Sequence, residues 1–217
     1  MSTATMILGQ SGTGKTTSLR NLNPTEVLLI QAVRKPLPFR SANWKPCTKA
    51  DPDGSILVTD MANVICGAMQ RTKKPIIVID DFQYILANEF MRRSEEKGFE
   101  KFTDIARHAW NILMCASQLP HETRVYIMAH TQEDEHGGVK AKTIGKLLDE
   151  KITIEGLLTI VMRTKVINGQ YLFSTQNNGS DTVKTPIDMF SDEHIPNDLA
   201  AVDSAITEYY GLTSTTD

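Results

Sequence analysis

The sequence predicts an α/β protein in which helices flank a mainly parallel central sheet. Short apolar runs alternate with amphipathic stretches of helix length along most of the 217 residues, as expected for strands joined by crossover helices. The run Ile76-Ile77-Val78-Ile79 contains only β-branched residues and is typical of a strand buried on both faces. No repeat or low-complexity block interrupts the pattern, so a single domain over residues 1–217 is expected.

The first half of the chain contains a long segment whose apolar residues fit neither the helix period nor the strand period. Residues 34–54 carry four prolines and few periodic apolar residues, which predicts an irregular loop and suggests a lid or an interface segment. Around this segment the pattern predicts strands at 5–8, 27–32 and 55–59, a helix at 15–21 that stops before Pro24, and a helix at about 61–71.

The second half ends in an expected antiparallel extension of the sheet. Asn168-Gly169 separates two apolar stretches at 157–167 and 170–175, and this dipeptide is the favoured two-residue hairpin turn. The remaining expected elements are a helix at about 100–118, a strand at 124–130, a closing helix through Leu199, Val202, Ile206 and Tyr209, and a polar tail at 211–217.

Composition and charge exclude several classes of protein. Lysine and arginine number 23 against 26 acidic residues, for a net charge of −3, so a generic polybasic role is excluded. Cys47, Cys66 and Cys115 have no paired spacing, which argues against a disulfide framework and a structural zinc site. No export signal and no apolar run near the roughly 20 residues of a membrane span is visible. We therefore expect a cytoplasmic protein with no membrane partner.

The strongest motif lies near the amino end. Residues 9–16 read Gly-Gln-Ser-Gly-Thr-Gly-Lys-Thr and fit the P-loop pattern G-x-x-x-x-G-K-[ST]. The glycines let consecutive N–H groups form an anion nest beside a helix N-terminus. Lys15 is expected to reach the β- and γ-phosphates, and the Thr16 hydroxyl to bind Mg²⁺. The expected nucleotide-binding residues are Gly9, Gln10, Ser11, Gly12, Thr13, Gly14, Lys15, Thr16 and Thr17.

Carboxylates at the ends of two expected strands complete the predicted site. Asp80 ends the strand at 76–80, at the carboxyl edge of the sheet where the P-loop also lies, and is the expected outer-sphere partner of the Mg²⁺ held by Thr16. Asp81 occupies the place where many P-loop ATPases carry a water-polarising glutamate. Its role stays open between catalysis and capping of the following helix. Asp60, after the preceding strand, is a rival base. No N-K-x-D element for guanine is present, so ATP is the expected nucleotide.

With the P-loop, the strand IIVIDD and the strand RVYIMAH in this order, the chain resembles the RecA-like ATPases encoded by bacteriophages. The resemblance covers roughly residues 4–190. It implies a RecA-type core and ATP-linked work on single-stranded DNA in recombination or annealing, in the cytoplasm of a bacterial host. It also implies assembly into homo-oligomers and partners among phage or host replication and recombination proteins.

The same resemblance assigns a role to the end of the strand at 124–130. In that family a polar residue there senses the γ-phosphate and relays its presence to a mobile DNA-binding loop, and His130 and Gln132 stand at the matching place. The alternative for His130 is a strand-end histidine held by backbone contacts. The following segment, 133–145, combines Gly137-Gly138 with lysines and with acidic residues, so DNA contact and an ordinary solvated loop both stay open.

The sequence departs from the RecA pattern after the second strand, where only Gln31 stands at the place of the usual catalytic glutamate. Hydrolysis is therefore expected either to be slow or to use a group from another position. Arg92 and Arg93 are either arginine fingers that reach the nucleotide of a neighbouring subunit or part of a solvated helix face. Lys184 resembles a lysine near the end of some RecA-like proteins that contacts the γ-phosphate bound to the adjacent subunit. Two alternatives to a DNA-acting ATPase stay open. One is a nucleoside or nucleotide kinase with residues 34–54 as its lid, and the other is a nucleotide-gated adaptor or loader in replication or packaging.

Overall fold

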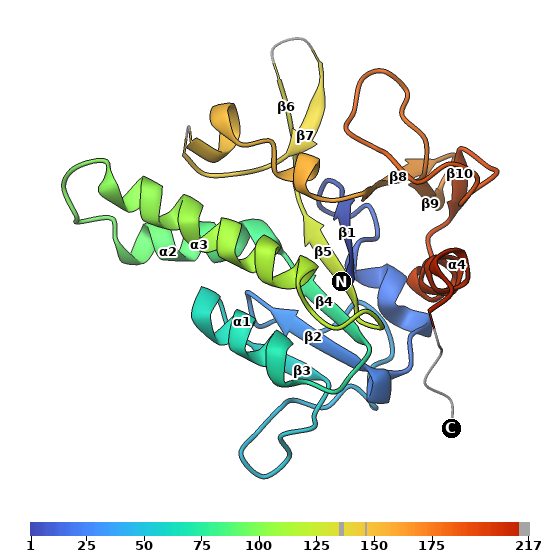
Figure 1. Cartoon of the computed structure of the whole chain (residues 1–217), viewed down its shortest axis with the longest axis horizontal. Helices are drawn as coiled ribbons and strands as arrows, with labels where there is room; N and C mark the ends of the chain where they lie inside the picture. The colour runs from blue at the N-terminus through green and yellow to red at the C-terminus, as the bar shows by residue number, and fades with distance from the viewer. Residues whose placement is uncertain (135–136, 146, 213–217) are drawn as a thin grey trace.

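The computed structural model describes residues 1–134, 137–145 and 147–212. It confirms an α/β architecture, in which these residues form an eight-stranded, mostly parallel sheet flanked by helices (Figure 1). The strand order is β10-β9-β8-β1-β5-β4-β2-β3. The strands are β1 (Thr3–Leu8), β2 (Val27–Gln31), β3 (Ile56–Val58), β4 (Ile76–Asp80), β5 (Arg124–Ala129), β8 (Ile160–Ile167), β9 (Gln170–Ser174) and β10 (His194–Pro196).

Parallel pairing brings the ends of three central strands to one edge of the sheet. β5 pairs with β1 on one side and with β4 on the other, with Leu8 opposite Ala129 and Ile79 opposite Ile127. The residues that follow these strands therefore emerge side by side at the carboxyl edge, where ligands of open α/β sheets bind. They are the glycine-rich loop at 9–16, Asp81 and His130.

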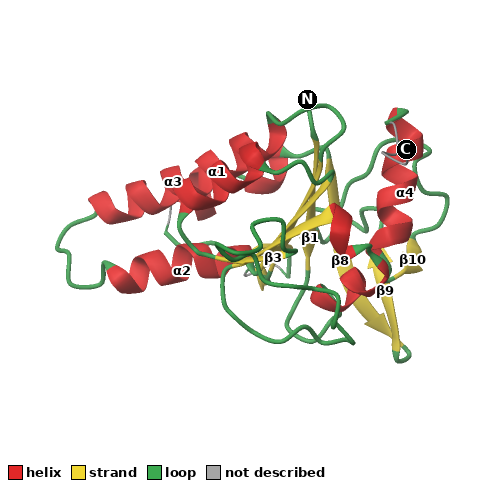
Figure 2. Ribbon diagram, turned by 90° about the horizontal axis from the view of Figure 1, so that it is seen from below, coloured by secondary structure: helices red, strands yellow, loops and turns green. Residues whose placement is uncertain are grey.

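Helices cover both faces of the sheet and form two apolar cores. On one face lie α1 (Ala62–Arg71), α2 (Phe82–Arg92) and α3 (Glu100–Ser117), and on the other lies α4 (Leu199–Tyr210) (Figure 2). A 3-10 helix, η1 (Thr16–Asn21), shares the core of the α4 face, where Leu19 packs with Val202 and Phe173. Because β4 is buried along its whole length between the two cores, its carboxylate end is held rigidly.

The expected hairpin is confirmed. β8 and β9 pair antiparallel with Ile167 opposite Gln170. Asn168 and Gly169 between them have φ of 52° and 78°, as a two-residue turn with two left-handed residues requires. β10 then pairs antiparallel with β9 and extends the sheet beyond the two strands that the sequence predicts.

Several elements differ from the sequence-based expectations. The first helix begins at Thr16 rather than Lys15 and has 3-10 geometry. The strand expected from 157 begins at Ile160, because residues 154–157 form a 3-10 turn, η4 (Ile154–Leu157). Two other short helices are η2 (Pro24–Glu26) and η3 (Leu147–Lys151). Helix α4 ends at Tyr210 with Gly211 as its C-cap, and Leu212 is buried rather than part of a polar tail; residues 213–217 lie outside the described residues.

The described residues after β5 include two short strands where the sequence predicts a loop. β6 (Thr131–Glu133) and β7 (Val139–Ala141) form an antiparallel hairpin that stands beyond the end of β5 (Figure 1). Asp134 accepts a hydrogen bond from the Gly138 amide at 2.7 Å beside its turn. Lys140 lies on β7, whereas Glu135, His136 and Lys146 lie outside the described residues.

Residues 34–54, all of which the structure describes, form no helix and no strand beyond one bridge at Pro46. The segment is anchored nevertheless, since Leu37 and Trp44 are buried in the core of the α4 face. Across the described parts of the chain, no helix is long and apolar enough to span a bilayer.

Candidate functional site

The glycine-rich loop at 9–16 is held by hydrogen bonds to both neighbouring strands. The Gly9 amide donates to the Ala129 carbonyl of β5 at 3.1 Å. On the other side the hydroxyls of Thr13 and Thr164 lie 2.6 Å apart, and the Thr164 hydroxyl donates to the Leu8 carbonyl at 3.2 Å. These contacts fix the shape of the loop before any ligand binds.

Two of the loop's glycines are required by backbone conformation and one by space. Gly12 and Gly14 have φ of 80° and 94°, in the left-handed region that other residues rarely adopt. Gly9 has an ordinary φ, but a Cβ there would overlap the Thr164 hydroxyl oxygen. The loop therefore needs glycine at these positions for different physical reasons.

Lys15 places a buried ammonium group inside this loop. Its Nζ donates to the carbonyls of Gly9 at 2.8 Å and Gln10 at 3.0 Å, and the residue is 6% exposed. Burial lowers the pKa of Lys15 from 10.5 to about 8, although the charges of Asp81 and Asp80 act in the opposite direction. A desolvated ammonium whose hydrogen-bond acceptors are neutral carbonyls is well prepared to receive an anion.

Thr16 and Asp80 meet as the sequence predicts they should. The Thr16 hydroxyl lies 3.0 Å and 3.2 Å from the two Asp80 carboxylate oxygens. Asp80 is 1% exposed. Burial and then the like charge of Asp81 raise its pKa, while Lys35, Thr16 and Lys15 oppose that shift. The structure thus joins a hydroxyl and a carboxylate next to the loop, which are oxygen ligands of the kind that Mg²⁺ prefers.

Asp81 is held in a left-handed conformation directly after β4. Its φ and ψ are 59° and 46°, a region that costs most residues energy and is enriched at functional sites. It occupies the N-cap position of α2, but its side chain makes no capping hydrogen bond. The capping alternative is therefore wrong for this side chain, which contacts Lys35 and His130 instead.

Lys35 reaches the site from the irregular segment 34–54. Its ammonium forms an ion pair with Asp81 and lies 3.8 Å from Asp80 Oδ2. Although burial lowers it, the hydrogen bond to Asp81 and the charge of Asp80 raise the pKa of Lys35 overall. The sequence analysis places Lys35 only within a segment expected to be a lid or an interface loop, and it missed this pairing. The contact depends on how a proline-rich segment folds back, and no local pattern encodes that.

His130 follows β5 and lies between the loop and the carboxylates. Its Nε2 is 3.5 Å from Asp81 Oδ1, and its backbone amide donates to Gln83 Oε1 at 3.2 Å. Burial and the charge of Lys15 lower the pKa of His130, while Asp81 opposes them. A neutral imidazole is therefore favoured near pH 7.

Other predicted residues lie apart from this cluster. Asp60 follows β3, which β2 separates from β4, and its carboxylate pairs with Arg92 at 2.6 Å. Burial raises the pKa of Asp60, but hydrogen bonds from Arg92 and Asn88 lower it overall. Arg93 pairs with acidic residues at 89, 96 and 104. Lys184 forms an antiparallel bridge with Val161 of β8. The structure therefore does not bring Asp60 to the site as a rival to Asp81.

Among the described residues, no group of three or more histidine, cysteine, aspartate or glutamate side chains is arranged to hold a metal ion. A site made of one hydroxyl and one carboxylate fits a cation that takes its remaining ligands from phosphate oxygens and water, as Mg²⁺ does with nucleotides.

No protein-family model matches the chain, and no curated protein matches it significantly.

Proposed function

We propose that the chain is a Mg²⁺-dependent P-loop ATPase of RecA-like type that acts on single-stranded DNA in phage recombination or annealing. The observation that carries the proposal is the Lys15 ammonium, buried inside a glycine-rich loop and adjacent to the Thr16–Asp80 pair. Together these groups offer donors for a triphosphate and oxygen ligands for its metal ion.

Each residue has a defined task in this proposal. The loop amides and Lys15 bind the β- and γ-phosphates, and Thr16 and Asp80 hold Mg²⁺, which when bound would neutralise charge on the transferred phosphoryl group. Asp81 is the best-placed carboxylate to orient an attacking water. Its Oδ2 is paired with the Lys35 ammonium, which competes with a water for the carboxylate and supports the expectation of slow hydrolysis.

The strand order supports a link between phosphate binding and a distant surface. β5 lies between β1 and β4, so His130 can contact the γ-phosphate and the Asp81 carboxylate. The chain continues directly from His130 into the β6–β7 hairpin, and the amide of Lys142, the residue after β7, donates to the His130 carbonyl at 2.7 Å. Movement of His130 would thereby displace the hairpin with Lys140 on β7 and Lys142 directly after it, lysines suited to a single-stranded backbone.

The direct test is titration calorimetry of MgATP into the wild-type protein and the Lys15→Ala variant. Charge-assisted contacts to the phosphates predict that Lys15→Ala weakens binding at least about 100-fold, because a pair of such hydrogen bonds contributes about 3 kcal/mol or more. Its thermal unfolding should stay cooperative. Equal ATP affinity of the two proteins would overturn the assignment of the loop.

The second measurement is the ATPase rate and the particle mass with and without single-stranded DNA. Stimulation together with assembly supports the recombinase. Phosphoryl transfer to added nucleosides rather than to water, detected by mass analysis, would instead identify a kinase. ATP binding without turnover in either condition would identify a nucleotide-gated adaptor.

A further inference from the structure

Beside the glycine-rich loop lies a buried amide without hydrogen-bond partners. Asn197 follows β10 and is 3% exposed, and among the described residues neither its Nδ2 nor its Oδ1 has a partner. A buried primary amide that makes no hydrogen bond costs the fold free energy, so such a group calls for an explanation. A Cβ built on Gly14 would lie 3.1 Å from Asn197 Oδ1. The unpartnered amide therefore borders the loop itself.

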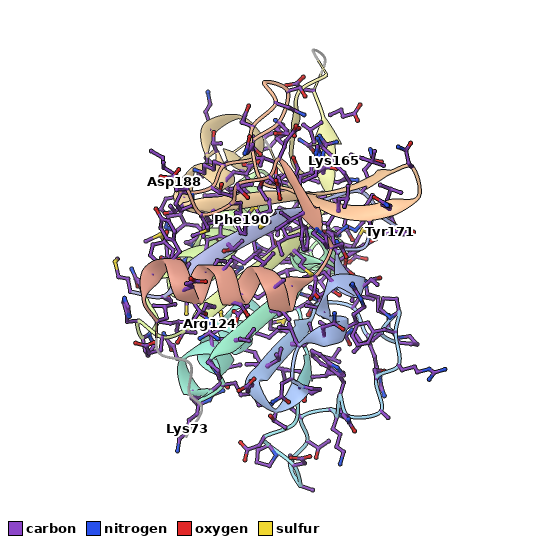
Figure 3. All side chains as sticks on the ribbon, turned by 90° about the vertical axis from the view of Figure 1, so that its right-hand side faces the viewer. Lys73, Arg124, Lys165, Tyr171, Asp188 and Phe190 are labelled. Carbon is purple, nitrogen blue, oxygen red and sulfur yellow. The ribbon has the colours of Figure 1, made fainter. Side chains whose placement is uncertain are left out.

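An exposed aromatic ring borders the same glycine. Tyr171 lies on β9, two residues before Phe173, so both side chains are on the α4 face of the sheet. Phe173 is fully buried in the core, whereas Tyr171 is 51% exposed. Its Cδ1 would lie 3.0 Å from a Cβ on Gly14. Figure 3 labels Tyr171 on the β8–β9 hairpin, on the side of the molecule where α4 packs.

The backbone holds these two side chains on one rigid frame. The Asn197 amide donates to the Tyr171 carbonyl at 3.1 Å, and Arg20 of η1 donates to the Asn197 carbonyl at 2.6 Å. Asp198, the next residue, caps α4 through the Ala200 amide. The loop, its following helix and the β9–β10 edge are thereby tied together, and the site is preorganised apart from the Tyr171 ring.

We propose that Tyr171 and Asn197 form the base-binding part of the nucleotide site and select adenine. This inference rests on the proposed function, since the phosphates must lie in the loop for the base to reach this edge. The Tyr171 ring supplies a stacking surface. An asparagine amide can both donate and accept, which matches adenine's N6–H and N7, whereas guanine presents two acceptors on that edge. Because the Asn197 amide is buried in the present conformation, side chains around it must move to admit the base.

Titration calorimetry with MgATP, MgGTP and Mg-tripolyphosphate separates the base from the phosphates. Tyr171→Ala should weaken ATP binding at least about fivefold, since stacking on an aromatic ring contributes about 1–3 kcal/mol per base. It should leave tripolyphosphate binding unchanged within twofold. The Tyr171→Phe variant keeps the aromatic ring and should bind ATP like the wild type. The matched control is Tyr209→Ala, which removes a different exposed tyrosine that lies on α4.

Asn197→Ala should reduce the preference for ATP over GTP at least about fivefold while tripolyphosphate still binds, which also shows that the loop has folded. Unchanged ATP affinity in Tyr171→Ala overturns the base site, and so does an equal loss for ATP and tripolyphosphate. If wild-type protein binds tripolyphosphate but shows no preference among nucleotides, the base site is wrong and the phosphate loop stands. If it binds none of the three ligands, the proposed function is wrong as well.

Discussion

Replacement of Gly9 tests whether the loop's shape is set by its contact with β8. Gly9 does not have the positive φ of Gly12 and Gly14, so left-handed strain does not oppose alanine there and the expected cost of Gly9→Ala comes from space. The new Cβ would overlap the Thr164 hydroxyl, lie 2.7 Å from Thr13 Oγ1 and lie 3.2 Å from Thr164 Cβ. Because Thr164 is 3% exposed and packed within β8, it can yield only by giving up its hydrogen bond to Leu8.

The expected cost follows from these contacts. Overpacking costs about 1–3 kcal/mol, and the lost hydrogen bond about 1 kcal/mol, so Gly9→Ala should lower the free energy of unfolding by about 2–4 kcal/mol. Thr164→Ala should cost about 1 kcal/mol by itself. In the double variant the overlapping hydroxyl is gone, and the total cost should be about 2 kcal/mol rather than the sum of the single costs.

Urea unfolding followed by tryptophan fluorescence measures this coupling. Gly12→Ala is the matched control, because a Cβ there meets nothing within 4 Å and the strain comes from its φ of 80°; Thr164→Ala should not rescue it. A coupling energy below about 0.5 kcal/mol between Gly9→Ala and Thr164→Ala would refute the reasoning, since independent sites add within that limit.

Two further predictions concern ionisable side chains. Asp203 binds Arg124 and Tyr126, and burial raises the pKa of Tyr126 well above 10. Above pH 10 the unfolded state therefore releases the Tyr126 proton before the folded state does, and the free energy of unfolding should fall by up to about 1.4 kcal/mol more per pH unit. Urea titrations at several pH values should show this added slope in the wild type and not in Tyr126→Phe. Equal slopes in the two proteins would refute the assignment. Lys35 repels a cation at Asp80, so Lys35→Met should increase the rise in Tm that Mg²⁺ alone produces. An identical Mg²⁺-induced shift in both proteins would show that the ammonium does not compete with the metal ion.

The sheet was predictable because its signals are local. The β-branched run before Asp80 requires a strand buried on both faces, and Asn168-Gly169 requires a tight hairpin; the structure has both. The contact between Thr16 and Asp80 was also predictable, since Asp80 ends one parallel strand, the loop before Thr16 follows another, and both strands end at the same carboxyl edge of the sheet. These inferences need only the spacing of apolar residues, the residue types that turns prefer and the direction in which the strands run.

The remaining features of the site depend on tertiary packing. Lys35 reaches Asp81 because the segment 34–54 folds back onto the sheet edge, and Asn197 reaches Gly14 because β10 adds a strand that no periodic pattern marks. Asp60 appeared equivalent to Asp81 in sequence, yet it follows β3, which is the outermost strand of the sheet and is separated from β4 by β2. Sequence spacing gives the residue types of such a site, but the order of strands decides which of them meet.

The central claim is that the glycine-rich loop encloses a triphosphate, and a crystal structure with Mg²⁺ and a non-hydrolysable ATP analogue tests it most directly. The predicted result is a triphosphate inside residues 9–16, with Lys15 Nζ moved from the carbonyls of Gly9 and Gln10 onto phosphate oxygens. The metal ion should lie against Thr16 and Asp80. The account would be contradicted by a crystal saturated with the analogue in which Lys15 still donates to those carbonyls and the analogue is bound elsewhere.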